Sequence, residues 1–294
     1  MQAPVQLIGG WYDLFLPQML ADYARLRRAG HRPQLSVGPW FHLDPRWTPC
    51  ALRETLLWFQ AQVLGRRALL REAPVRVFVM GEDAWRELPD WPPPAREERW
   101  HLQAEGGLSP ALPSASEPDR YCYDPADPTP SVGGSTLAPH AGVRDNRALE
   151  ARSDVLVYTS APLEREVLAM GPVRAELYVR SSLPHADFFA RLCDVTPSGR
   201  SRNICDGLVR LRPGAGADGA IRVEIELSAT AHCWKPGHRV RLQVSSGAHP
   251  RHARNHGTGE PLATAMTLRC AEQAVYHDPA RPSALLLPIV PTTR

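Results

Sequence analysis

Residues 5–13 (VQLIGGWYD) and 34–42 (QLSVGPWFH) share one pattern that decides the first part of the fold. In each, an apolar run typical of a buried strand leads through a glycine and a tryptophan to a side chain capable of acid–base chemistry, Asp13 or His42. Between them, apolar side chains recur at helical spacing over 15–29, which predicts a strand–helix–strand unit. Because a helix connects the two strands, they should lie parallel and side by side.

The same α/β pattern continues to about residue 80. Gly30 should end the first helix. A second helix is expected over 51–70 because apolar side chains recur there, at Leu52, Leu56, Phe59 and Val63. A third strand is expected over 75–80. Three parallel strands and two helices would leave one sheet edge open and one face thinly covered, so we expect the isolated chain to self-associate or to be unstable.

The helical period disappears after Trp91-Pro92-Pro93-Pro94. Short alternating runs follow, separated by Gly, Pro, Asp and Ser, at 155–158, 173–179, 188–195, 208–211, 221–227 and 240–244. Such spacing is typical of an antiparallel β-sandwich or jelly roll. The expected fold class is therefore α/β plus β, with an α/β part over 1–95 and a β-sandwich domain over 96–294, in which 104–147 should form a long ordered loop.

Composition and charge narrow the function classes. With 294 residues, 43% of them hydrophobic, the chain suits one large or two medium domains. A net charge of +3, evenly spread, argues against a nucleic-acid partner, and no apolar run reaches the roughly 18–20 residues that span a membrane. The N-terminus lacks the features of a secretion signal, and the six cysteines form no C-x-x-C pair. We therefore expect a cytoplasmic protein with free thiols, unless an upstream signal has been lost.

Asp13 and His42 each have an ordinary structural explanation as well as a chemical one. Asp13 precedes a helix and could cap its first turn, and His42 could be a surface or hydrogen-bonded imidazole. Together they indicate more, because reactive groups in open α/β sheets lie beyond the carboxyl ends of the strands. The order Asp then His is that of α/β-hydrolases, in which the carboxylate orients the imidazole and the imidazole moves the nucleophile's proton. The pair would supply two members of a Ser-His-Asp triad.

Around these residues the chain resembles the CocE/NonD-type acyl hydrolases, the family of cocaine esterases and X-Pro dipeptidyl-peptidases. The matching motifs run in order along nearly the whole chain: GGWYD (9–13), GPWFH (38–42), FVMG (78–81), WR (85–86), DWP (90–92), YDP (123–125), GG (133–134), RSDVL (152–156), DF (187–188), DV (194–195) and GHRVRL (237–242). The resemblance implies that Asp13 is the triad acid, His42 the triad base and Phe15 an aromatic side chain lining the substrate pocket. It also implies that 1–95 is the C-terminal part of an α/β-hydrolase sheet and 96–294 a galactose-binding-like jelly roll packed over the active site.

One member of the expected triad is missing. The family's nucleophile is a serine in a Gly-x-Ser-x-Gly turn upstream of the aspartate, and this sequence contains no such motif. Ser36 lies inside an expected strand, and Ser245 and Ser246 lie in the expected sandwich, so we expect none of them to replace it. The chain would then be the C-terminal half of a longer enzyme or a truncated gene product. We expect no acyl-hydrolase activity from it alone, because losing a triad nucleophile costs on the order of 10⁶ in turnover.

Three hypotheses follow for the function. In the first, the chain is part of a serine acyl hydrolase that acts on small-molecule esters, amides or X-Pro peptides through an acyl-enzyme and without a cofactor. In the second, it is an orphaned jelly roll that binds a carbohydrate or a protein partner. In the third, a separately encoded N-terminal half supplies the serine and completes the sheet.

No metal site is expected. Three histidines have ligand-like spacing, but Pro250 among them and the absence of a helical pattern predict a loop between strands; they are His249, His252 and His256. Four aspartates could suggest Ca²⁺, although turn and capping roles are commoner for aspartates in loops; they are Asp124, Asp127, Asp187 and Asp194.

Overall fold

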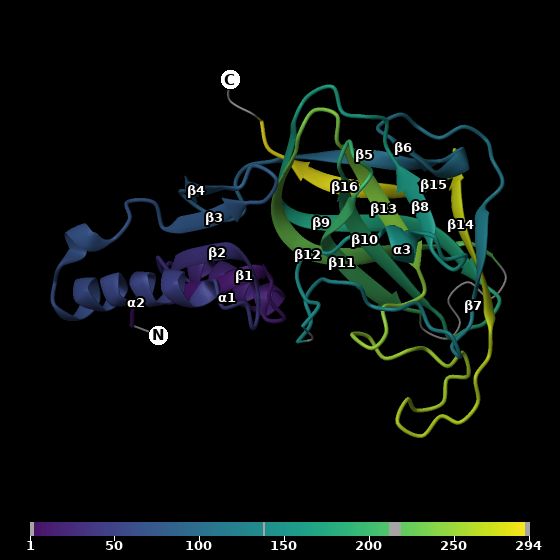
Figure 1. Ribbon diagram of the computed structural model, residues 1–294, viewed down its shortest axis with the longest axis horizontal. Coiled ribbons are helices and arrows are strands. Elements are labelled where there is room, and N and C mark those ends of the chain that lie inside the picture. Colours follow the sequence, from purple (N-terminus) through teal and green to yellow (C-terminus); the bar gives the residue numbers. More distant parts are fainter. Residues whose placement is uncertain (1–2, 138, 212–218, 292–294) are drawn as a thin grey trace.

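The computed structural model describes residues 3–137, 139–211 and 219–291, which form a mostly β structure with few helices (Figure 1). Its strands belong to two sheets, which among the described residues have four and twelve strands. The four-stranded sheet, with the two longer helices, lies at one end of the molecule, and the larger sheet forms the rest (Figure 1).

The first sheet has the strand order β1-β2-β3-β4. Its elements are β1 (Gln6–Tyr12), α1 (Leu16–Arg28), β2 (Gln34–Phe41), α2 (Trp47–Val63), a 3-10 turn (Arg67–Leu69), β3 (Val75–Val79) and β4 (Ala84–Leu88). The predicted parallel pairing of the first two strands is confirmed, β3 adds parallel to β2, and β4 adds antiparallel to β3. Gly30, at φ +81°, ends α1 as expected, because this backbone conformation suits glycine better than other residues.

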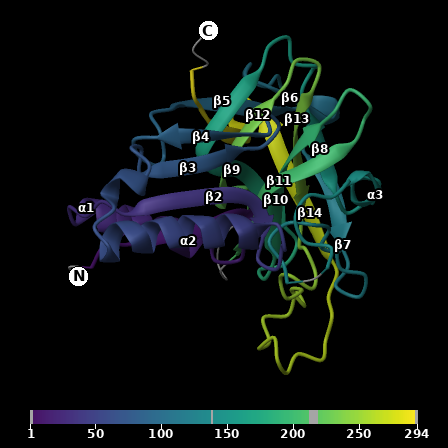
Figure 2. The ribbon, with the colours of Figure 1, turned by 60° about the vertical axis from the view of Figure 1, so that its left-hand side comes forward.

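The second helix differs from its prediction at both ends. It runs over Trp47–Val63 instead of 51–70, ending two residues before Gly65. Its expected apolar stripe does not face the sheet: Leu52, Leu56 and Phe59 are 59%, 53% and 58% exposed, and Val63 is 71% exposed. In Figure 2 the helix runs along β2 at the outside of the molecule. An apolar helix face is therefore left without a partner in the described chain.

The face of α2 that packs on the sheet contains a buried carboxylate, Glu54. Its side chain is 4% exposed and pairs with Arg71 at 2.8 Å and Arg76 at 3.0 Å, while the Ser36 hydroxyl donates a further hydrogen bond to it. Burial acts to raise the pKa of Glu54, but these three partners outweigh it and hold the pKa below 4.5. The carboxylate therefore stabilises the fold only while it is ionised.

Replacing Glu54 by Gln should lower the free energy of unfolding by about 3 kcal/mol at pH 7, because Arg71, whose side chain is 16% exposed, loses its counter-charge. The pKa of Glu54 is lower in the folded than in the unfolded protein. Its contribution to stability is therefore fully present above the unfolded-state pKa and is lost as the pH falls through the folded-state pKa. The difference between wild type and variant should therefore shrink below about pH 4.5, measured by urea unfolding at several pH values. The same substitution at exposed Glu87 should change stability by less than about 0.5 kcal/mol.

The second sheet is almost entirely antiparallel, with the path β11-β10-β13-β8-β6-β5-β16-β9-β14-β15; β12 pairs with β9, and β7 with β14. Its elements are β5 (Arg96–Gln103), a 3-10 turn (Ala104–Gly106), β6 (Gly107–Ser109), β7 (Asp119–Tyr123), α3 (Arg147–Glu150), β8 (Leu156–Thr159), β9 (Val167–Ser181), β10 (Asp187–Val195), β11 (Ser201–Arg210), β12 (Ile221–Trp234), β13 (Arg239–Ser245), β14 (Ala271–Asp278), β15 (Arg281–Pro282) and β16 (Ala284–Ile289). The predicted strands all fall within or beside these, several of which are longer than expected. The jelly-roll topology and the domain boundary near 95 stay predictions.

Backbone hydrogen bonds join the two sheets. The Met80 N–H, just beyond β3, donates to the Ala231 carbonyl at 2.9 Å, and the Cys233 N–H of β12 donates to the Met80 carbonyl at 2.8 Å. Both sheets contribute to one continuous core of buried apolar side chains. Within the described ranges, no helix has the length and apolar character needed to cross a membrane.

Candidate functional site

The structure brings Asp13 and His42 together at the carboxyl ends of β1 and β2. The strands end at Tyr12 and Phe41, which are partners in the parallel register, so the next residue of each strand emerges at the same edge. Nδ1 of His42 lies 3.2 Å from Oδ2 and 3.3 Å from Oδ1 of Asp13. With Nδ1 directed at the carboxylate, Nε2 is left to face a reacting group, as in a triad histidine.

The alternative role of Asp13 as a helix cap is not what the structure has. The N-cap of α1 is Phe15, and no side chain caps this helix. Oδ1 of Asp13 instead accepts the Phe15 backbone N–H at 2.9 Å, and the Asp13 N–H donates to the Gly10 carbonyl at 3.0 Å. The local turn therefore holds the carboxylate toward His42.

Phe15, the predicted substrate-pocket residue, lies beside the pair. Its ring is 61% exposed and meets the His42 ring edge-on, with the centroids 5.2 Å apart. A cavity of about 360 Å³ is lined by Asp13, His42 and Phe15 together with apolar side chains that include Trp47. The three residues thus share one open cavity that combines a carboxylate–imidazole pair with an apolar wall.

The serines considered as replacement nucleophiles have partners elsewhere. Ser36 is fully buried and donates to Glu54 behind the sheet. Ser245 donates to the Gly247 carbonyl, and Ser246 is hydrogen-bonded to Tyr121. None of the three lines the cavity at His42.

A second cavity, of about 600 Å³, lies between the two sheets, and sequence reasoning did not predict it. Tyr12 lines it from β1, and the larger sheet contributes Asp194, whose carboxylate accepts hydrogen bonds from His238 at 2.7 Å and His232 at 3.3 Å. Burial acts to raise the pKa of Asp194, but the two imidazoles outweigh it and lower the pKa. No sequence motif could reveal this group, because His232 and His238 lie 38 and 44 residues after Asp194 in the chain.

The aspartates considered for Ca²⁺ are bound by the protein itself. Asp127 pairs with Arg152, and Asp187 pairs with Arg210. Asp124 accepts the backbone N–H of Ala126. Across 3–137, 139–211 and 219–291, no three His, Cys, Asp or Glu side chains gather as a metal site would require, including His249, His252 and His256.

Comparison with known proteins places the chain beside hydrolases. Residues 68–286 match the model of the family described as "X-Pro dipeptidyl-peptidase C-terminal non-catalytic domain". Cocaine esterase from Rhodococcus sp. (strain MB1 Bresler) is 34% identical over an alignment 324 positions long, which covers 98% of this chain and 56% of that protein. The chain therefore spans about half the length of this relative.

Two solved structures share the fold. One is an α-amino acid ester hydrolase, with a TM-score of 0.87 and 24% identity over 98% of this chain and 56% of that one. The other is an aminopeptidase from the marine sediment archaeon Thaumarchaeota archaeon, with a TM-score of 0.86 and 24% identity over 99% of this chain and 55% of that one. At such identities the likeness concerns the fold alone.

Proposed function

Because the chain belongs to the CocE/NonD-type acyl hydrolases and corresponds to their C-terminal half, we propose that it supplies the acid and the base of a serine acyl hydrolase. The observation that carries the proposal is Nδ1 of His42 lying 3.2 Å from the Asp13 carboxylate, beyond the ends of two adjacent parallel strands. The substrates would be small-molecule esters, amides or X-Pro peptides. In this proposal 1–95 is the end of an α/β-hydrolase sheet and 96–294 is a jelly roll.

Asp13 and His42 would act in sequence on a serine hydroxyl. Asp13 holds the imidazole with its proton on Nδ1, so Nε2 accepts the serine proton as the hydroxyl oxygen attacks the acyl carbon. The imidazolium, stabilised by Asp13, then gives this proton to the leaving alcohol or amine as the acyl-enzyme forms. A water molecule, deprotonated in the same way, releases the acid. Phe15 would pack against the acyl or leaving group.

The serine would come from a polypeptide segment outside this sequence, which contains no Gly-x-Ser-x-Gly motif. Two features of the structure support a partner at this place. β1 pairs only with β2 among the described strands, so its outer edge is open to a further parallel strand. The exposed side chains of Leu52, Leu56 and Phe59 form an apolar helix face of the kind that marks an interface.

Reconstitution tests the proposal. The part of the Rhodococcus cocaine esterase that precedes the matched region would be expressed separately, mixed with this chain and assayed with p-nitrophenyl acetate. We expect neither polypeptide alone to hydrolyse the ester and the mixture to do so. Turnover by this chain alone that is abolished by His42→Ala would contradict a serine located elsewhere, and turnover of the mixture that persists in the His42→Ala variant would contradict the assigned roles.

A second function has one observation in its favour: the matching family model is described as a non-catalytic domain and begins at residue 68, after both Asp13 and His42. The chain would then be a binding module for a carbohydrate or a protein. A glycan array probed with the full chain separates the two possibilities, because a module should bind equally well with Asp13 replaced by Asn.

The apolar face of α2 leads to a prediction about association. Replacing Leu56 and Phe59, which are 53% and 58% exposed, by Glu should convert a concentration-dependent oligomer of the isolated chain into a monomer. Light scattering coupled to size-exclusion chromatography would measure the mass. Arg53→Glu, on an exposed position of the same helix, is the matched control and should leave the mass unchanged. A wild-type chain that is monomeric at all concentrations would contradict the prediction.

A further inference from the structure

The residues immediately before Asp13 and His42 both contact the β-rich part of the chain, one a strand of the larger sheet and the other a loop attached to it. Tyr12 is 2% exposed, and its hydroxyl donates a hydrogen bond of 3.0 Å to the backbone carbonyl of Asn203 on β11. Phe41, its register partner on β2, packs against Gly142, where an added Cβ would come within 3.3 Å of the Phe41 ring. The side of β1 and β2 opposite the acid–base pair therefore rests on the sandwich.

Asn203 connects these two contacts. Its side-chain amide donates to the Gly142 carbonyl at 3.0 Å, and its side-chain oxygen accepts the Arg144 N–H at 2.8 Å. Its own backbone carbonyl is the acceptor for Tyr12. Asn203 is 1% exposed, so its amide has few alternative partners in solvent. Asn203 therefore links two contacts. Its side chain holds the loop that packs against Phe41, and its backbone carbonyl binds Tyr12.

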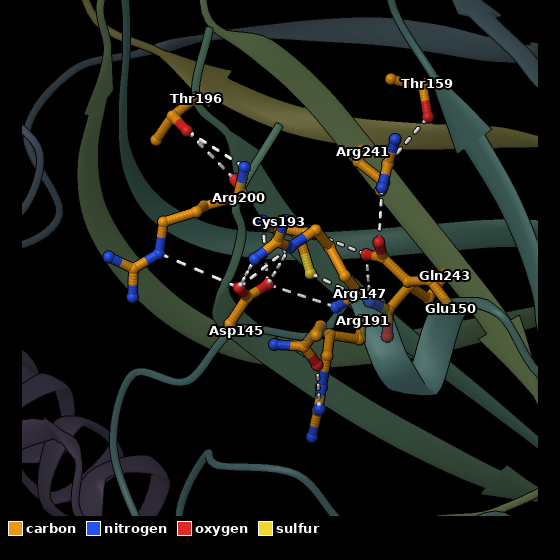
Figure 3. Close-up of polar contacts among 12 residues, drawn as sticks. Asp145, Arg147, Glu150, Thr159, Arg191, Cys193, Thr196, Arg200, Arg241 and Gln243 are labelled. Atoms are coloured by element: carbon orange, nitrogen blue, oxygen red, sulfur yellow. Dashed lines mark hydrogen bonds and ion pairs between the residues drawn. The ribbon is translucent and has the colours of Figure 1, made fainter. Parts of the chain in front are cut away.

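A polar network anchors the loop that carries Gly142. Arg191, fully buried, donates to the side-chain oxygen of Asn146 at 2.8 Å. Figure 3 shows how the adjoining helix α3 is held. Glu150 at its end accepts hydrogen bonds from Arg241 and Gln243 of β13. Asp145, just before the helix, pairs with Arg147 and Arg200. Because Arg191 and Asn146 are fully buried and the side chain of Glu150 is 7% exposed, this part of the network can hold the loop in position against the two strands.

We infer that Tyr12, Asn203 and Gly142 are positioning residues that set the alignment of Asp13 with His42. The inference rests on the proposed function, since alignment matters only if the pair performs proton transfer. None of the three lines the cavity at His42, so their effect passes through the backbone of β1 and β2. Misalignment would weaken the Nδ1–carboxylate contact and release the imidazole to its other tautomer.

The tautomer of His42 is the readout. In the full chain labelled with ¹⁵N-histidine, the nitrogen shifts of His42 would be recorded at about pH 9, above the ordinary histidine titration range. The wild type should hold the proton mainly on Nδ1. Tyr12→Phe keeps the ring but removes the bond to Asn203, and it should lower the ratio of the Nδ1–H to the Nε2–H form about threefold. Gly142→Ala, which pushes on Phe41, should lower the ratio as well.

Tyr121→Phe is the matched control. Tyr121 is 4% exposed, and its hydroxyl makes a hydrogen bond of 2.9 Å with the Ser246 hydroxyl, away from β1 and β2. The substitution removes this buried hydrogen bond just as Tyr12→Phe removes the one to Asn203. It should lower the thermal midpoint as Tyr12→Phe does, without moving the tautomer ratio. An unchanged ratio in folded Tyr12→Phe and Gly142→Ala, or an equal change in Tyr121→Phe, would overturn the inference.

The tautomer measurement tests the positioning role, and the reconstitution assay tests the proposed function, so one hypothesis can be wrong while the other holds. A ratio that moves with Tyr12 and Gly142 supports the positioning role even if the reconstituted mixture is inactive, in which case the proposed function fails. If the mixture is active but neither the His42 tautomer ratio nor the turnover changes in Tyr12→Phe, the proposed function stands and the positioning role is wrong.

Discussion

In the reconstituted enzyme, His42→Ala should lower turnover of p-nitrophenyl acetate by about 10⁶, as loss of the histidine does in a serine protease triad. The reason is that the serine hydroxyl would lose the acceptor for its proton. Asp13→Asn should cost about 10⁴, because the imidazole remains but is no longer held in the reactive tautomer. The initial rate at saturating substrate is the measurement.

The control for this pair is His31→Ala in the same part of the chain. His31 lies between α1 and β2, where its backbone N–H completes the end of α1 by donating to Leu26 at 3.0 Å, a bond that alanine keeps. Its turnover should equal that of the wild type. A His42→Ala enzyme within tenfold of wild type would show that His42 is not the base.

The second large effect is on stability, at Asp206. This carboxylate is 5% exposed and lies between two guanidinium groups, Arg191, which is fully buried, and Arg251. Burial acts to raise the pKa of Asp206, but Arg251 and Arg191 outweigh it and lower the pKa. Asp206→Asn would leave two close cations without their shared counter-charge, and the free energy of unfolding should fall by about 3–5 kcal/mol.

Urea unfolding at pH 7 measures this loss, with Asp145→Asn as the matched control. Asp145 also lies between two arginines, Arg147 and Arg200, but its side chain is 26% exposed and those of the arginines are 58% and 55% exposed. Solvent screens such pairs, so the control should lose no more than about 1 kcal/mol. Equal losses in the two variants would contradict the assignment of Asp206 to the buried core of the network.

The proximity of Asp13 and His42 was predictable because all of its determinants are local. Each strand is a short apolar run, the connecting helix has a regular stripe, and both polar residues directly follow the last strand residue. A parallel crossover then allows one arrangement only, with Asp13 beside His42. The prediction that Phe15 lines the substrate pocket came from the family resemblance and not from any such pattern.

The second helix was misjudged because its buried face depends on distant residues. The side of α2 that faces the sheet includes Ala51, Trp58 and the carboxylate of Glu54. The charge of Glu54 can be buried only because it is paired with Arg71 and Arg76, which lie 17 and 22 residues further along the chain. The more apolar stripe of the helix faces outward. Periodicity gives the apolar face of a helix but cannot say which partner covers it.

Strand β5 was missed for a related reason. Its charged start resembles a solvated loop, but Arg99 pairs with Glu176 of β9 at 3.1 Å, and Glu97 pairs with Arg174 of the same strand. These cross-strand pairs join residues 77 positions apart. The cavity with Asp194 and the support of Tyr12 by Asn203 are equally non-local, so they became visible only in three dimensions.

The central claim, that this chain supplies the acid and base for a serine located elsewhere, is tested most directly by covalent labelling. A fluorophosphonate, which reacts with activated serines, would be added to the reconstituted mixture, and the modified residue would be located by mass spectrometry. We predict labelling of the Gly-x-Ser-x-Gly serine of the added half only when this chain is present with His42 intact. Labelling of a serine in this chain, or labelling of the other half that is equally fast with His42→Ala, would contradict the claim.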